Sequence, residues 1–239
     1  MVAKALVFDV DDTLYDLAGP YRVAYAEVFG SRYDLPVEEL FKVSRVHSDE
    51  ALELLTAGKI SEEDHKVLRV QWTLADWGVH VSREEALVFQ EAYARAQRHI
   101  ALYPEAVEML DACASASVPL GIISNGDAAH QFGKMRLLGL ERWFARSHMV
   151  ASGELGAHKP ATAPFMAMER LLGASGAGIW YVGDTYETDV VGAKRVGWSS
   201  LWLDIRGREV PSVPESPDVV VHSPREMCDA VKSLLRPCA

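Results

Sequence analysis

Cysteine is scarce in this sequence of 239 residues, which contains only Cys113, Cys228 and Cys238. An odd number of cysteines with no C-x-x-C spacing argues against both a disulfide framework and a structural zinc site. Unpaired thiols suit a reducing compartment, so we expect a cytoplasmic protein.

Long apolar runs and an excess of positive charge are also missing. No apolar stretch approaches the roughly 18 residues that a membrane span needs, and Asp9 interrupts the first apolar run too early for a signal peptide. The 24 Lys and Arg residues are outnumbered by 34 Asp and Glu, which gives a formal net charge of −10. An acidic chain without a basic patch is not expected to bind nucleic acid or a membrane surface. A small anionic substrate would therefore need a metal ion, or a positively charged side chain positioned in the binding site, to offset its charge.

The sequence does contain a regular alternation of two patterns. Short apolar runs rich in β-branched and aromatic residues indicate buried strands, and helical spacings of apolar residues lie between most of them. This alternation predicts an α/β fold, a doubly wound, Rossmann-like sheet of parallel strands. The expected strands are Lys4 to Val10, Pro119 to Ser124, Gly178 to Val182, Ser200 to Leu203 and Asp218 to Val221, with a weaker one at His148 to Ala151.

The stretch between the first two strands breaks this alternation, because its patterns are helical almost throughout. Apolar spacing is helical in residues 21–29 and 39–46, and Ser61 and Ser82 each precede acidic residues in the pattern that opens a helix. We therefore expect about four helices here, as an all-helical insert over residues 16–100. The sheet domain then comprises residues 1–15 and 101–239.

Carboxylates directly follow two of the expected strands. The first strand runs into Asp9-Val10-Asp11-Asp12-Thr13, and a later one runs into Gly183-Asp184. Ligands of open parallel sheets bind beyond the carboxyl ends of the strands, where the strand order reverses. Each cluster alone would fit the capping of a following helix, but together they would crowd several negative charges into one cleft. A hard divalent cation such as Mg²⁺ would offset the cost of that crowding.

Two further segments carry small polar groups or a cation. The second expected strand ends in Ser124-Asn125-Gly126, where the glycine lets the backbone approach a ligand closely. Lys159 precedes Pro160, which favours an extended conformation at the lysine. Alone, the first segment is also typical of an ordinary turn, and the second is also typical of a solvated surface lysine.

In order and position, these four segments resemble the motifs of the haloacid dehalogenase (HAD) superfamily, in its phosphatase branch with a helical cap after the first motif. The resemblance covers nearly the whole chain. It implies that the helical insert is a cap domain on a Rossmann-like catalytic core. The matching residues are Asp9 to Thr13, Ile123 to Gly126, Lys159-Pro160, and Gly183-Asp184 with Asp189.

The resemblance implies a catalytic or metal-binding role for the acids. Asp9 would attack phosphorus and form an aspartyl-phosphate. Asp11 would protonate the leaving oxygen and then take a proton from the water that hydrolyses the intermediate. Mg²⁺ would be held by Asp9, the backbone carbonyl of Asp11, and Asp184, while Asp189 would be an acceptor behind these ligands.

The resemblance also implies which residues hold the substrate. Ser124, Lys159 and the backbone amide of Asn125 would bind the phosphoryl oxygens, where negative charge spreads in the transition state. Thr13 and Gly126 are further expected substrate-binding residues.

The expected function is therefore Mg²⁺-dependent hydrolysis of a small phosphorylated metabolite. Asp11 argues against carbon–halogen cleavage, because the dehalogenases of this superfamily lack a second acid there. A sugar-phosphate mutase stays open, although mutases usually carry Gly where this chain has Asp12. A phosphonatase stays open because Lys42, Lys59 and Lys66 lie in the insert, where they also fit a solvated surface. Loss of a motif residue would indicate a catalytically silent binding module, and none is lost.

The motifs identify neither the substrate nor an oligomeric state. Residues around Tyr15 and Asp16, and a loop expected at Val46 to Glu50, would face the active site and select the leaving group. Phosphorylated sugars, phosphoglycolate, cofactor phosphates and nucleoside monophosphates all fit. A nucleoside monophosphate is slightly favoured, because Gly183-Asp184-Thr185 resembles nucleotidase relatives.

Overall fold

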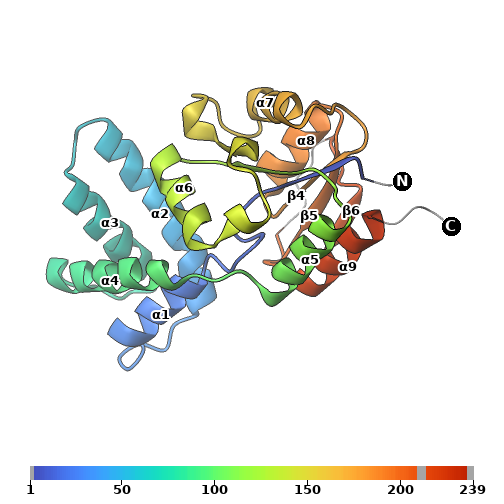
Figure 1. The fold of residues 1–239 in the computed structure, drawn as a ribbon. Helices are drawn as coiled ribbons and strands as arrows, with labels where there is room; N and C mark the ends of the chain where they lie inside the picture. Colours follow the sequence, from blue (N-terminus) through green and yellow to red (C-terminus); the bar gives the residue numbers. More distant parts are fainter. Residues whose placement is uncertain (1–2, 209–213, 236–239) are drawn as a thin grey trace. The chain divides into compact units, whose positions relative to one another are not determined.

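The chain divides into two compact units (Figure 1). A computed structural model describes residues 3–208 and 214–235, so Cys238 lies outside the described residues. The first unit, which we call the core unit, combines Met1–Asp16 with Ala101–Ala239. The second, the helical unit, is Leu17–Ile100.

The core unit is built on a six-stranded parallel sheet with the strand order β3-β2-β1-β4-β5-β6. This sheet confirms the parallel α/β fold expected from the sequence. The chain adds β2 and β3 on one side of β1 and then crosses to β4 on the other, so the strand order reverses at β1. The strands are β1 (Ala5–Phe8), β2 (Leu120–Ser124), β3 (Met149–Ala151), β4 (Ile179–Gly183), β5 (Ser199–Leu203) and β6 (Val219–Val221).

Alternate side chains of β1 face opposite layers of the core unit. Ala5 and Val7 pack with Phe165 of α7 in one buried cluster, whereas Phe8 meets Phe144 edge to face, with ring centroids 6.0 Å apart. Figure 1 shows α7 and α8 on one face of the sheet and α5 and α9 on the other. The helices of this unit are α5 (Pro104–Ser115), α6 (Ala128–Leu137), α7 (Thr162–Leu172), α8 (Val191–Arg195) and α9 (Pro224–Leu234).

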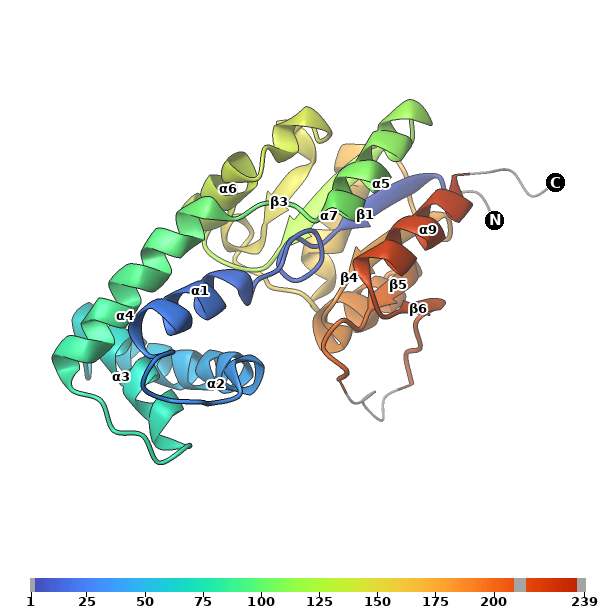
Figure 2. The ribbon, with the colours of Figure 1, turned by 90° about the horizontal axis from the view of Figure 1, so that it is seen from below.

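The helical unit has an aromatic core of its own. Phe29 and Phe89 stack at a centroid distance of 5.5 Å, and Tyr21 meets the Phe89 ring edge to face at 5.2 Å. Ser61 and Ser82 open two of its helices with capping boxes, as their sequence contexts predict. Figure 2 shows these helices from below: α1 (Gly19–Val28), α2 (Val37–Thr56), α3 (Glu62–Ala75) and α4 (Arg83–Ala96).

The loop expected at Val46 to Glu50 is wrong, because these residues lie inside α2. The helix continues to Thr56 since no glycine or proline interrupts residues 37–56. Ala51, which is fully buried, extends the apolar face of α2 past the expected end.

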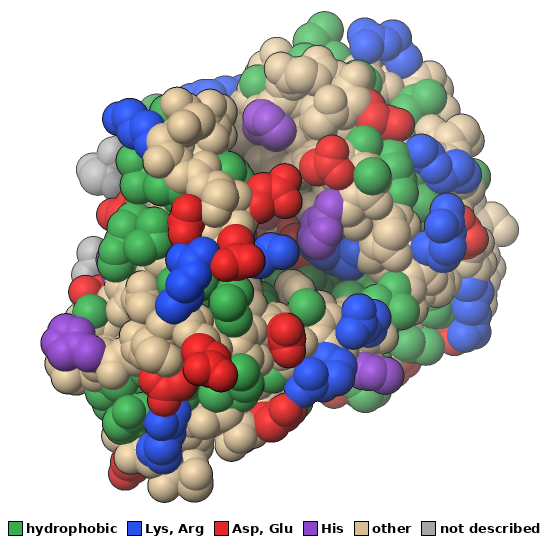
Figure 3. Space-filling view, turned by 90° about the vertical axis from the view of Figure 1, so that its left-hand side faces the viewer, with side chains coloured by type: hydrophobic (Ala, Val, Ile, Leu, Met, Phe, Trp, Pro, Cys, Tyr) green, Lys and Arg blue, Asp and Glu red, His purple; other side chains and the backbone are tan. Residues whose placement is uncertain are grey.

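The outside of the molecule carries charges of both signs. On the face shown in Figure 3, Lys and Arg side chains are interspersed with Asp and Glu rather than gathered in one basic patch. Cys113 and Cys228 are buried free thiols. Within residues 3–208 and 214–235, no helix has the length and apolar character needed to cross a membrane.

Close packing between α7 and α8 makes Gly192 sensitive to substitution. A Cβ at this position would lie 2.4 Å from atoms of the Phe165 ring and 3.3 Å from Cα of Pro160. Phe165 is fully buried and has little room to move. We expect Gly192→Ala to lower the free energy of unfolding by about 1–3 kcal/mol in urea denaturation.

The matched control is Gly133→Ala, in an exposed part of α6 where an added Cβ meets nothing within 4 Å. It should be neutral or stabilising by up to about 1 kcal/mol, since alanine is the better helix former. Equal effects of the two substitutions would contradict the packing proposed for Gly192.

Candidate active site

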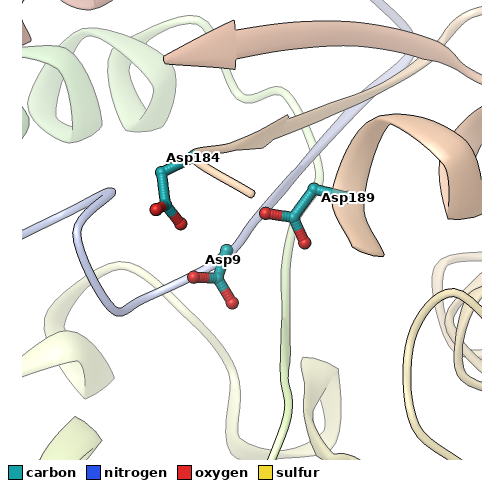
Figure 4. A group of neighbouring side chains, drawn as sticks. All are labelled: Asp9, Asp184 and Asp189. Carbon is teal, nitrogen blue, oxygen red and sulfur yellow. The ribbon is translucent and has the colours of Figure 1, made fainter. Parts of the chain in front are cut away.

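Three aspartate side chains meet at the carboxyl edge of the sheet. Asp9 directly follows β1 and Asp184 directly follows β4, and the parallel register brings these two strand ends level. Asp189 lies in a π-helical turn just before α8. Figure 4 shows the three carboxylates pointing toward one another. All three are buried, and their oxygens approach within 4.8 Å of one another.

Lys159 places a buried ammonium among these carboxylates. Its Nζ donates to Oδ1 of Asp9 and to Oδ1 of Asp189, each at 2.7 Å. It also donates to the Tyr181 hydroxyl at 2.8 Å, and that hydroxyl in turn donates to the carbonyl of Ile123. All three donor positions of the ammonium therefore have acceptors, which fixes its place.

Burial makes the repulsion between the carboxylates costly. Burial, together with the charges of Asp189 and Asp11, raises the pKa of Asp9 to about 7 against the attraction of Lys159. Burial raises the pKa of Asp184 as well, and the charges of Asp189 and Asp9 act in the same direction. Burial alone would lower the pKa of Lys159, but Asp189 and Asp9 outweigh it and hold that pKa well above its usual value. Lys159 therefore stays charged, and its single positive charge offsets only part of the negative charge of the neighbouring carboxylates.

The donor set of this cluster fits a hard divalent metal ion. Mg²⁺ prefers carboxylate oxygens, and a cation beside Asp9, Asp184 and Asp189 would reduce the repulsion that raises the pKa of Asp9. Asp184 meets a guanidinium in this structure, because Nη1 of Arg208 lies 2.9 Å from its Oδ2 and donates to its backbone carbonyl at 2.8 Å. The sequence did not single out Arg208.

Asp11 is held by two side chains of the core unit. The Tyr15 hydroxyl donates to its Oδ1 at 2.6 Å. Lys134 of α6 donates to both of its carboxylate oxygens, at 2.6 and 2.7 Å. The same ammonium lies 3.2 Å from Oε1 of Gln131. The carboxylate of Asp11 is thus oriented from two directions, by a near neighbour in the sequence and by a distant lysine.

The loop after β2 is tied to the segment that carries Lys159. Asn125 Oδ1 accepts from the backbone N–H of Lys159 at 2.9 Å, and Asn125 Nδ2 donates to the Lys159 carbonyl at 3.1 Å. Ser124 donates to Oε1 of Gln131 at 3.0 Å. Gly126 has a φ of +137°, a conformation that favours glycine. The structure therefore brings Ser124, Asn125 and Lys159 to the edge of the sheet where the acids lie.

Two residues of the first motif are buried in the turn that follows β1. Asp12 adopts a φ of +54° and accepts two hydrogen bonds from Arg206, at 2.7 Å to Oδ2 and 2.6 Å to Oδ1. Thr13 is fully buried, and its hydroxyl has no hydrogen-bond partner in the part of the chain that the structure describes. The pair with Arg206 thus holds Asp12 in the turn, and Thr13 is buried next to it in the sequence.

Sequence reasoning missed several residues that orient this site. Tyr181 offered a signal, because a hydroxyl in a buried strand needs a partner. Lys134 and Arg206 offered none, since each meets an acid of the first motif from a distant part of the chain.

Comparison with known proteins is consistent with this geometry. A family model of haloacid dehalogenase-like hydrolases matches residues 3–197. A glyceraldehyde 3-phosphate phosphatase of Methanopyrus kandleri is 28% identical over 98% of this chain and 99% of its own length. A phosphoserine phosphatase of Thermus thermophilus is 33% identical over 60% of this chain and 57% of its own.

Solved structures show the same fold at lower identity. The HAD-hydrolase YfnB of Bacillus subtilis, bound to magnesium, aligns with a TM-score of 0.67 at 21% identity. The alignment covers 97% of this chain and 99% of YfnB.

The buried charges predict that stability depends strongly on Lys159. Lys159→Met would leave Asp9 and Asp189 without their ammonium, so we expect the free energy of unfolding to fall by about 3–5 kcal/mol at pH 8. The pKa of Asp9 is raised from 3.8 to about 7, so this group favours folding at low pH and loses that contribution as the pH rises toward 7. The loss should therefore be smaller at pH 5, where the carboxyl binds a proton. Urea denaturation of the metal-free protein measures both values.

Lys194→Met is the matched control, because Lys194 pairs with Asp218 at 2.7 Å on the outside of the core unit. Its loss should cost no more than about 1 kcal/mol at either pH. The electrostatic account of the site fails if the two variants are destabilised equally.

Proposed function

The chain belongs to the haloacid dehalogenase-like hydrolase family, and from that membership we propose that it is a Mg²⁺-dependent phosphatase of a small phosphorylated metabolite, acting through an aspartyl-phosphate on Asp9. One observation carries the proposal. Asp9 is a buried carboxylate at the strand edge, held by Lys159, with a second acid two residues later that is held by Lys134. In the proposed mechanism Asp9 is the nucleophile, Asp11 is the proton donor and Lys159 is the cation that binds phosphate.

The proposed reaction has two displacements at phosphorus. In the first, an oxygen of Asp9 forms a bond to phosphorus while the bond to the leaving oxygen breaks, and Asp11 gives its proton to that oxygen. In the second, Asp11 takes a proton from water as the water oxygen attacks phosphorus, and the bond to Asp9 breaks to release phosphate. Each step leaves Asp11 in the protonation state that the next one needs.

The remaining groups would stabilise negative charge on the phosphoryl group and would form no covalent bond to it. Mg²⁺, held by Asp9, Asp184 and the backbone carbonyl of Asp11, would neutralise negative charge at phosphorus, with Asp189 behind it. Lys159, Ser124 and the Asn125 amide would bind the phosphoryl oxygens.

The substrate-binding roles of the glycine and the buried threonine rest on the resemblance alone. The φ of +137° at Gly126 supports a close backbone approach there. The complete burial of Thr13 supports a role in shaping the first turn beside any role toward substrate.

Specific observations weigh against the alternatives within this fold. Asp12, which stands where mutases usually carry glycine, is engaged in its pair with Arg206. A phosphonatase would need a reactive lysine in the insert, and there Lys42 pairs with Glu39 while Lys59 and Lys66 are exposed. The acids and the lysine expected to carry the chemistry are all present, which weighs against a silent binding module.

The names of the relatives support the class of substrate. Glyceraldehyde 3-phosphate and phosphoserine, named for two of them, are both small phosphate monoesters. A cytoplasmic location, predicted from the cysteines, stays a prediction.

The test of the proposal is turnover of p-nitrophenyl phosphate. We expect activity that requires Mg²⁺ and falls by ~10³-fold or more in Asp9→Asn, because the nucleophile is lost. Mass spectrometry after acid quenching should find the phosphoryl group on the peptide that contains Asp9. Millimolar Mg²⁺ should also raise the Tm of the wild-type protein, and raise it less in Asp184→Ala.

The control for these measurements is Asp229→Asn, which removes an exposed acid from α9 and should leave both activity and the Mg²⁺ effect unchanged. Full activity in excess chelator, or undiminished turnover by Asp9→Asn, would refute the proposed function.

A separate prediction concerns proton transfer by Asp11. Asp11→Asn should lower kcat/KM for an alkyl phosphate by about 10²- to 10⁴-fold, because an alkoxide is a poor leaving group without a proton. The loss should be much smaller for p-nitrophenyl phosphate, whose leaving group needs little protonation. Lys134→Met, which frees one side of the Asp11 carboxylate, should show the same pattern with about a tenfold loss for the alkyl ester.

Lys194→Met serves again as the control, and it should leave kcat/KM unchanged for both esters. If Lys134→Met slows both esters equally, Lys134 supports the fold and does not position Asp11.

A further inference from the structure

Gln131 is a buried polar residue in the first turns of α6, shortly after the loop that follows β2. Asp127 caps this helix, because its Oδ1 accepts from the backbone N–H of His130 at 2.9 Å and its carbonyl accepts from the N–H of Gln131 at 2.9 Å. Gln131 itself is 4% exposed. A buried amide needs partners for both its oxygen and its nitrogen, so the contacts of this side chain show what it supports.

The amide oxygen of Gln131 accepts from two groups that have different tasks in the proposed reaction. The Ser124 hydroxyl donates to Oε1 at 3.0 Å, and Nζ of Lys134 donates to the same atom at 3.2 Å. Ser124 is expected to bind a phosphoryl oxygen. Lys134 holds the expected proton donor, Asp11, through hydrogen bonds of 2.6 and 2.7 Å. One atom of Gln131 therefore contacts both the phosphate-binding loop and the lysine that orients the acid.

The amide nitrogen of Gln131 anchors the backbone of the same loop. Nε2 donates to the carbonyl of Asn125 at 2.9 Å. On the opposite side of that peptide unit, the N–H of Gly126 donates to Oγ of Ser152 at 3.0 Å. The peptide unit between Asn125 and Gly126 is thus held from both sides, and Gln131 provides one of the two anchors.

The surrounding groups determine which way the amide of Gln131 points. The reversed amide would direct its –NH₂ at the Lys134 ammonium and would bring its oxygen against the carbonyl of Asn125, so both contacts would become repulsive. Gly126 leaves the space that the observed orientation needs. A Cβ at this position would lie 2.6 Å from Nε2 of Gln131. The glycine of the second motif therefore lets the amide reach the Asn125 carbonyl.

Lys134 depends on Gln131 for one of its three acceptors. Two of its hydrogen bonds go to the carboxylate oxygens of Asp11, and the third goes to Gln131. An ammonium on a flexible stem is fixed only when its donors are all engaged. Proton transfer requires the acid to be held in the correct geometry, so freedom at Lys134 would reduce the rate through Asp11. All of these residues belong to the core unit.

We propose that Gln131 is a positioning residue that couples phosphate binding to proton donation. This inference rests on the proposed phosphatase function and adds to it a residue that forms no bond to the substrate. Gln131 acts on phosphate through Ser124 and Asn125, and on the leaving group through Lys134 and Asp11. Loss of its amide should therefore weaken the binding of phosphate and, separately, slow the departure of leaving groups that need a proton.

Phenyl phosphate and p-nitrophenyl phosphate test the effect on proton donation. The two esters have similar shapes, but phenolate is the more basic leaving group and depends more on the proton from Asp11. Gln131→Met keeps the length of the side chain and removes its hydrogen bonds. We expect it to lower kcat/KM about tenfold for phenyl phosphate and about threefold or less for p-nitrophenyl phosphate, with the excess loss for phenyl phosphate in kcat.

A double-mutant cycle with Lys134→Met tests the route through the lysine. Lys134→Met alone should also slow phenyl phosphate more than p-nitrophenyl phosphate. Adding Gln131→Met should leave the ratio of the two losses unchanged, because Gln131 reaches Asp11 only through Lys134. A double variant in which the two selective losses multiply would overturn the proposed coupling.

Binding of inorganic phosphate, measured by calorimetry in the presence of Mg²⁺, tests the other half of the proposal. Gln131→Met should raise the Kd for phosphate by about 3- to 10-fold, because Ser124 and the Asn125 peptide each lose a hydrogen bond. This measurement does not depend on turnover.

Gln131→Glu is the second variant, and it fills the same space, so its result stands even if methionine disturbs the packing. Its carboxylate can still accept from Ser124 and Lys134, but it cannot donate to the Asn125 carbonyl. The ratio of kcat/KM for the two esters should return to within about twofold of the wild-type ratio. Phosphate should bind more weakly than in the wild type, because the added negative charge repels it. A ratio that stays as low as in Gln131→Met would overturn the positioning role of the amide oxygen.

The matched control is Gln71→Met in the helical unit. The Gln71 amide also donates to a backbone carbonyl, that of Val81, at 3.0 Å. Its loss should change neither the two kcat/KM values nor the Kd for phosphate.

Equal losses for both esters in Gln131→Met, together with an unchanged Kd for phosphate, would show that Gln131 only supports the fold and would overturn the inference. If the wild-type protein hydrolyses neither ester, the proposed function fails. Phosphate binding then decides the inference by itself: an equal Kd in the wild type and Gln131→Met overturns it, and a higher Kd in the variant supports it.

Discussion

The Lys159 ammonium lies 2.7 Å from carboxylate oxygens of both Asp9 and Asp189, in a space where all three side chains are buried. Like charges in a buried space are tolerated only when a cation and sufficient hydrogen bonds accompany them. The neighbouring structure supplies these conditions. Tyr181 occupies the remaining donor position of Lys159, and Asn125 brackets its backbone from both sides. The strand order of the sheet also contributes, because it brings the ends of β1 and β4 level and so places Asp9 and Asp184 side by side.

The sequence predicted those parts of the fold that depend on local pattern. Apolar runs located the strands of the sheet, and the Ser61 and Ser82 contexts located two helix starts that the structure confirms. The loop expected at Val46 to Glu50 is wrong because an exposed stretch of helix is as polar as a loop. Only the absence of glycine and proline up to Thr56 distinguishes this helix from a loop in the sequence, and that signal is weaker than a helix cap.

Proximity of the acidic clusters could be predicted, whereas the partners that orient them could not. Parallel strands end at one edge, so carboxylates after two strands imply a common site. Lys134 reaches Asp11 across 123 residues, and Arg206 reaches Asp12 across 194. Contacts at such separations depend on how helices and loops pack, which no local pattern in one sequence encodes. For the same reason, the separate roles expected for Asp9, Asp11, Asp184 and Asp189 come from family resemblance and not from a local pattern.

Lys159 shows how a buried cation can orient its neighbours before any ligand arrives. Its three donor positions are taken by the carboxylates of Asp9 and Asp189 and by the Tyr181 hydroxyl, so its charge holds these groups in place. The Tyr181 hydroxyl donates in turn to the carbonyl of Ile123, which ties the ammonium to the neighbouring strand β2. Charged groups that are already oriented need little reorganisation when a ligand binds, and this is the condition under which electrostatic stabilisation is most effective.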